Sequence, residues 1–185
     1  MSALRPHLFL CDVSGSVDDI NWERIVFPAI QAKTERMEAG IDTPVFVWGI
    51  GVSTFGNPIE VTSSVVADPL SWKSLAERLG GRNGGTDLGQ ALNKVLDSGF
   101  IAEESIGRIT VFSDLLDWPF LQPVALEGRA IQVDFLGLPD MPEEYLKAFA
   151  EGVSSWAKTS RADLSSLTPQ KPDPERGALR RRGPR

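Results

Sequence analysis

Three short segments, far apart in the chain, carry side chains with hard oxygen ligands. They are residues 12–16 (Asp-Val-Ser-Gly-Ser), 85–87 (Gly-Thr-Asp) and 113–114 (Ser-Asp). The first and third directly follow the apolar runs 7–11 and 108–112. If these runs are parallel strands, their carboxyl ends meet at one edge of a sheet, where two carboxylates and three hydroxyls would converge. That ligand set predicts a site for a small hard cation such as magnesium.

The spacing within the first segment allows its side chains to act together. Gly15 has no Cβ, so the turn can bring the hydroxyls of Ser14 and Ser16 to the same side as the Asp12 carboxylate. Hydroxyls are neutral ligands, and magnesium usually keeps several waters in its octahedral shell. The ion would therefore retain much of its charge, and an incoming carboxylate could displace a water and bind it directly.

Together the three segments resemble the von Willebrand factor A (vWA) domain, in which such loops form the metal-ion-dependent adhesion site (MIDAS). The resemblance covers roughly residues 6–160. It implies one Mg or Mn ion, held by hydroxyls and carboxylates. These implied ligands are Asp12, Ser14, Ser16, Thr86 and Asp114.

The third segment departs from the family pattern. The family commonly has Asp-Gly there, whereas this chain has Asp114 followed by Leu115. The nearby Asp117 could compete with Asp114 as the carboxylate ligand. Asp87 is a further carboxylate beside Thr86, although it could simply cap the helix that follows. The change at Leu115 also favours, to some degree, a weakened site.

Two tryptophans lie close to the metal segments in the sequence. Trp22 follows the first segment and Trp118 follows the third. Exposed aromatic residues are enriched at interfaces, so the pair is a candidate rim that contacts a partner around the ion. Ordinary packing in the core is the alternative.

Alternating strand and helix patterns position these segments. Apolar and β-branched runs predict strands at 7–11, 45–50, 60–66, 108–113 and 130–136. Helical patterns cover 18–38, 69–79, 88–97, 120–127 and 142–158. Pro28 should kink or split the first helix. This alternation predicts an α/β fold: a doubly wound, mostly parallel sheet of about five or six strands with helices on both faces, vWA- or Rossmann-like. Ligands of such sheets bind beyond the carboxyl ends of the strands.

The composition indicates one domain and a tail. Of 185 residues, 42 % are hydrophobic and 24 % charged, as in ordinary globular domains. We expect a vWA-like domain over 1–162 and a Pro- and Arg-rich, disordered tail over 163–185. No apolar stretch approaches the ~20 residues of a membrane span. The single cysteine and the lack of a secretory leader predict a cytoplasmic protein.

The charge distribution bears on the choice of partner. The net charge is −6, but residues 168–185 hold six basic and two acidic residues, which leaves −10 for the rest. An acidic body argues against nucleic-acid binding except through the basic tail.

Enzyme chemistry has little support in the sequence. His7 is the only histidine and lies at the start of a strand, so no histidine base stands beside Ser14 or Ser16. The resemblance to vWA domains implies instead an adaptor that captures an Asp or Glu of a partner protein through its metal. The resemblance adds that intracellular bacterial relatives often serve ATPases or multi-component complexes. Two alternatives stay open: a degenerate scaffold that acts through metal-independent contacts or homo-oligomerisation, and a less supported metal-dependent hydrolase.

Overall fold

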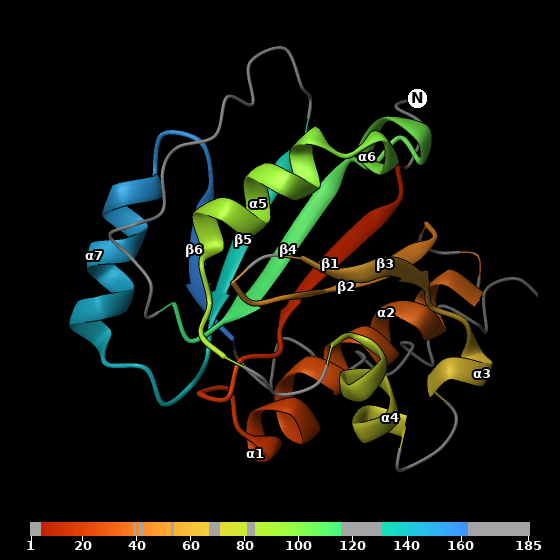
Figure 1. Ribbon diagram of the computed structural model, residues 1–185, viewed down its shortest axis with the longest axis horizontal. Coiled ribbons are helices and arrows are strands. Elements are labelled where there is room, and N and C mark those ends of the chain that lie inside the picture. The colour runs from red at the N-terminus through yellow and green to blue at the C-terminus, as the bar shows by residue number, and fades with distance from the viewer. Residues whose placement is uncertain are drawn as a thin grey trace, which may run out of the picture.

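A six-stranded sheet forms the centre of the protein (Figure 1). The computed structural model describes residues 5–38, 40, 43–52, 54–66, 71–80, 84–115 and 131–162. The strand order is β3-β2-β1-β4-β5-β6, and every neighbouring pair is parallel except β2 and β3. The strands are β1 (His7–Asp12), β2 (Val45–Ile50), β3 (Thr54–Glu60), β4 (Arg108–Ser113), β5 (Gln132–Gly137) and β6 (Lys158–Arg161).

Helices cover both faces of this sheet (Figure 1). One face carries α1 (Asp19–Asn21), the π-helix η1 (Trp22–Val26), α2 (Phe27–Glu38), α3 (Ser63–Val66) and α4 (Ser71–Arg78). The other carries α5 (Leu88–Asp97), α6 (Gly99–Glu103) and α7 (Glu143–Val153). The side chains of successive β1 residues point to opposite faces of the sheet, so Leu8 packs in one apolar cluster and Phe9 in the other. The predicted fold class is thus confirmed. None of the described helices is long and apolar enough to cross a membrane.

The central elements agree with the sequence prediction, and the peripheral ones differ. Strands at 45–50 and 108–113 and the helix at 88–97 are confirmed. The edge strand expected at 60–66 is wrong, because β3 spans Thr54–Glu60 and a helix begins at Ser63. The β-branched residues of 60–66 favour a strand by propensity, while Pro58 within β3 disfavours one except at a sheet edge.

The end of the last predicted helix is also wrong. The helix stops at Val153, and the short polar strand β6 follows at Lys158–Arg161. Four polar residues at a sheet edge have no apolar alternation that would reveal a strand. The helix expected at 120–127 and the tail expected at 163–185 lie outside the described residues.

Pro28 alters the first long helix as expected. The segment before it is a π-helix, in which the Phe27 N–H donates to the carbonyl of Trp22, five residues earlier. A proline ring clashes with the carbonyl four residues before it, and a π turn widens the helix at this point. The predicted split is therefore confirmed as a change of helix type.

Candidate metal site

The three oxygen-bearing segments meet at the carboxyl edge of the central strands. Since β1 and β4 are adjacent parallel strands, their last residues, Asp12 and Ser113, lie side by side. The Gly15 N–H donates to the carbonyl of Gly84 at 3.5 Å, which joins the first segment to the glycine-rich loop. The three oxygen-bearing segments therefore form one cluster.

Asp12 is the centre of this cluster. Asp12 is only 1 % exposed, and its carboxylate accepts hydrogen bonds from all three segments. The Ser14 N–H donates to Oδ1 at 2.8 Å, and the Ser113 hydroxyl donates to Oδ2 at 2.6 Å. The Thr86 hydroxyl lies 3.0 Å from Oδ1 and 3.1 Å from Oδ2. The Ser14 and Ser16 hydroxyl oxygens are 3.0 Å apart, so Ser16 joins the same network.

The Asp12 carboxylate has no positively charged partner among the described residues. Burial raises the pKa of the Asp12 carboxyl, hydrogen bonds from Ser113 and Ser14 lower it, and the nearby charge of Asp114 raises it further. No ion pair joins Asp12 to a lysine or arginine within the described part of the chain. A divalent cation bound at this cluster would supply positive charge and favour the ionised form of Asp12.

The donor set suits a hard, partly hydrated cation. The described residues contain no group of three or more His, Cys, Asp or Glu side chains that could hold a metal. The cluster instead offers two carboxylates and several hydroxyls, which are ligands that magnesium and manganese accept alongside water. The residues present therefore fit the implied ion, with Asp12, Ser14, Ser16, Thr86 and Asp114 as the groups that would hold it.

Ser113 has a role that the sequence did not assign. It is fully buried, donates to Asp12 and accepts the Leu115 N–H at 3.1 Å through the same oxygen. It thereby fixes both the carboxylate and the loop that carries Asp114. The only sequence signal for this role is its place as the last residue of a buried strand beside Asp12.

Two further predicted residues take other roles. Asp87 caps α5, because its Oδ1 accepts the Gln90 N–H at 2.8 Å. Trp22 is 0 % exposed and packs with Ile25 and Val26 in the core, so its assignment to a partner rim is wrong. The helix turns its side chain toward the sheet although it follows the metal segment closely. Asp117 and Trp118 lie outside the described residues.

The loop after Asp114 keeps a conformation that usually requires glycine. Leu115 has a φ of 56°, in the left-handed region. This conformation costs a side-chain-bearing residue about 1–2 kcal/mol. Leu115 is nevertheless 4 % exposed, and its side chain packs beside Gly137 near Met141 and Leu146. Apolar packing of the Leu115 side chain thus stabilises a backbone conformation that glycine would adopt without strain.

Solved structures share this architecture. The chain has the fold of vWA domains: it superposes on a von Willebrand factor type A protein from Catenulispora acidiphila with a TM-score of 0.54 and 18 % identity, over 89 % of this chain and 40 % of that one. An aerotolerance-related membrane protein from Bacteroides fragilis gives 0.58 and 18 %, over 88 % and 94 % of the two chains. The manganese-loaded TRAP protein of Plasmodium vivax gives 0.55 and 15 %, over 89 % and 71 %. No protein-family model and no curated protein sequence matches the chain.

Proposed function

We propose that this protein is a metal-dependent interaction module, which binds one Mg or Mn ion at the carboxyl edge of its sheet and captures an Asp or Glu of a partner protein. The observation that carries this proposal is Asp12. It is a buried carboxylate held only by neutral donors from three loops, with a second carboxylate nearby and no cationic partner among the described residues.

The residues of the cluster would have different roles in binding the ion. Asp12 and Asp114 supply negative charge, while Ser14, Ser16 and Thr86 supply neutral oxygens. Ser113 positions Asp12 through its 2.6 Å hydrogen bond. The bound ion would supply a local positive charge to which a carboxylate of a partner can bind directly. The manganese-loaded state of the Plasmodium vivax protein, which shares the fold, is consistent with this proposal.

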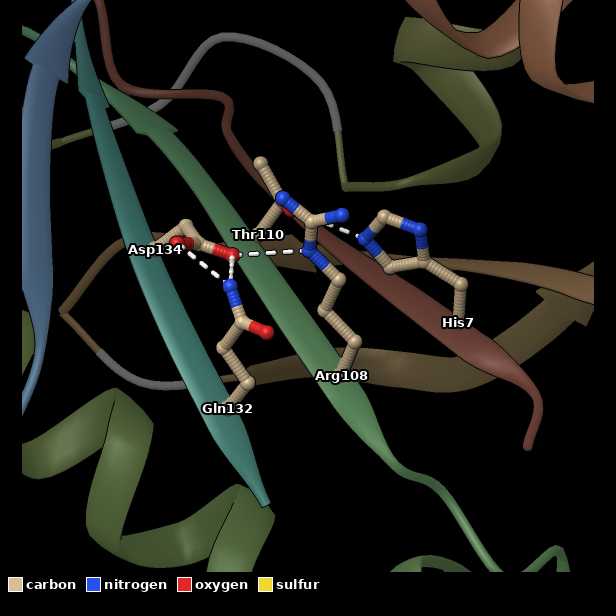
Figure 2. A network of polar contacts seen from close by, with 5 residues as sticks. All are labelled: His7, Arg108, Thr110, Gln132 and Asp134. Carbon is tan, nitrogen blue, oxygen red and sulfur yellow. Dashed lines mark hydrogen bonds and ion pairs between the residues drawn. The ribbon is translucent and has the colours of Figure 1, made fainter. Parts of the chain in front are cut away.

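Binding is better supported than catalysis. The only histidine of the chain, His7, lies at the opposite end of β1 from Asp12, with its Nε2 2.8 Å from the Thr110 hydroxyl (Figure 2). It therefore cannot serve as a base beside the cluster. A partner protein, such as an ATPase or another member of a cytoplasmic multi-component complex, is thus our preferred ligand class over a phosphoester substrate.

Calorimetric titration of the purified protein with Mg²⁺ and Mn²⁺ tests the proposal. We expect one-to-one binding that Asp12→Ala abolishes, while circular dichroism shows that the variant remains folded. Pull-downs in magnesium and in EDTA then test whether partner capture follows metal binding. Equal partner capture by wild type and Asp12→Ala would contradict the proposal and favour a degenerate scaffold that acts through its other surfaces.

A further inference from the structure

A cavity of about 280 Å³ lies on the side of the sheet that carries the first helical segments. Residues of α1 and η1 form one wall, and the connection from β5 to α7 forms the other. The lining residues are Asp18, Ile20, Asn21, Arg24, Ile25, Pro139 and Asp140.

The cavity adjoins the candidate metal site through the chain itself. Asp18 follows the site residue Ser16 by two positions, so their Cα atoms are at most about 7 Å apart. On the other wall, Pro139 comes shortly after Gly137, which pairs with Ser113 of the site across β4 and β5. An extended peptide advances about 3.3 Å per residue. A partner segment of a few residues can therefore reach both the ion and the cavity.

The cavity combines apolar walls with an excess of negative charge. Ile20, Ile25 and Pro139 are apolar; Ile20 is 56 % exposed, whereas Ile25 is only 2 % exposed. The charged lining residues are two carboxylates, Asp18 and Asp140, and one cation, Arg24.

The charged groups of the cavity do not neutralise one another. Arg24 forms no ion pair with either carboxylate within the described part of the chain. One oxygen of Asp18 accepts the Asn21 N–H at 2.7 Å as a helix cap, and Asp140 is exposed. The lining therefore carries a net charge of about −1, which favours a cationic occupant.

We propose that this cavity binds a lysine or arginine side chain of the same partner segment whose carboxylate meets the metal. The aliphatic stem of such a side chain would pack on Ile20 and Ile25, and its charged end would lie between Asp18 and Asp140. The partner motif is thus one acidic and one basic residue a few positions apart. This inference rests on the proposed function and adds a specificity pocket to it.

Synthetic peptides test the inference without knowledge of the natural partner. The probes are peptides of Gly, Ser and Ala that contain one Glu and one Lys, separated by one, two or three residues. A matched set replaces Lys by norleucine, which keeps the stem and removes the charge. Binding is followed in magnesium and in EDTA through the methyl NMR signals of Ile20 and Ile25 at peptide concentrations up to millimolar.

We expect magnesium-dependent binding of at least one Lys peptide, about two- to fivefold weaker for its norleucine match, the range of a solvent-exposed ion pair. Asp140→Asn should weaken the Lys peptide similarly and leave the norleucine peptide unchanged. Arg24→Gln should strengthen the Lys peptide, because it removes a like charge. A cavity that selects by shape alone would not produce these opposite signs.

The outcomes separate the two proposals. Magnesium-dependent binding with equal affinity for Lys and norleucine peptides would overturn the cavity assignment and leave the metal function standing. Binding that depends on Asp140 but survives EDTA and Asp12→Ala would overturn the metal function and support the cavity. If no peptide shifts the Ile20 and Ile25 signals, the cavity assignment fails, and the metal titration alone decides the proposed function.

Discussion

Two buried aspartates of one sheet, Asp12 and Asp134, are stabilised in opposite ways. Asp134, in β5, is 8 % exposed and pairs with the Arg108 guanidinium, whose Nε lies 2.7 Å from Oδ2. The Gln132 side-chain amide donates to both oxygens of Asp134, at 3.1 and 3.0 Å (Figure 2). Asp12 receives hydrogen bonds from neutral groups only. Among the described residues, Asp134 thus has a positively charged partner and Asp12 has none.

The contrast separates a structural polar network from a candidate binding site. A buried charge is tolerated when it is paired and hydrogen-bonded, as Asp134 is. Asp12 lies instead beside a second carboxylate, and burial raises the pKa of its carboxyl. Burial of a carboxylate without a positively charged partner is costly unless hydrogen bonds or a bound cation compensate for it. This contrast supports our proposal that the edge around Asp12 binds a cation, whereas the network around Asp134 stabilises the fold.

The strongest way to sharpen this contrast is to remove one neutral oxygen from the site. Thr86→Ala should weaken magnesium binding by about 10–100-fold, the range for losing a supporting ligand group. Thr86→Ser keeps the hydroxyl and should bind within a few-fold of wild type. Calorimetry measures both variants. Equal losses in the two would show that the methyl packing of Thr86, rather than its oxygen, matters.

Asp134→Asn is the matched change in the other network. It should lower the free energy of unfolding by about 1–2 kcal/mol, since a charge-assisted hydrogen bond is lost while the half-exposed Arg108 can turn to water. Urea denaturation measures this loss, and magnesium affinity should stay at the wild-type value. A large loss of magnesium affinity would contradict the proposal that the Asp134 network stabilises the fold without contributing to metal binding.

The strained loop after Asp114 provides a smaller effect. Leu115→Gly and Leu115→Ala both lose the packing of the leucine side chain, but only glycine adopts the left-handed conformation freely. The glycine variant should therefore be more stable than the alanine variant by about 1 kcal/mol. Paired thermal unfolding of the two variants measures the difference. Greater stability of the alanine variant would contradict the left-handed conformation.

The smallest expected effect is a pH dependence. Because the pKa of Asp12 is raised in the folded protein, its stabilising contribution is complete below the unfolded-state value of about 3.9 and is lost as pH rises through the folded-state pKa. In EDTA, wild type should lose stability relative to Asp12→Asn over this rise. Magnesium should reverse the loss, since it binds the ionised form. If the difference in unfolding free energy between wild type and Asp12→Asn changed with neither pH nor magnesium, the raised pKa of Asp12 would be contradicted.

The sequence predicted the centre of the molecule better than its edges. Val45–Ile50 is buried throughout, and Arg108–Ser113 is buried after its first residue. These apolar runs strongly favour strands. The edge strand β3 contains Gly56, Asn57 and Pro58, and tertiary pairing rather than propensity makes it a strand. Local pattern alone could not place it.

The candidate site was predictable in its membership but not in its internal contacts. Asp12, Ser14 and Thr86 were identifiable because ligand chemistry requires their side-chain types at strand and loop ends. The positioning role of Ser113 and the burial of Trp22 depend on which way each side chain points once the sheet has formed. Sequence proximity to the site is a poor guide to exposure, as Trp22 and the exposed Ile20 show.

The parallel direction of β6 has a practical consequence for handling the protein. Its last residue, Arg161, pairs with Gly137, which in turn pairs with Ser113 of the site, so β6 ends at the edge where the oxygen cluster lies. His7, at the start of β1, lies at the opposite edge. A tether attached directly after Ala162 would therefore start from the edge that carries the oxygen cluster. A tether attached directly before Arg5 would start from the opposite edge.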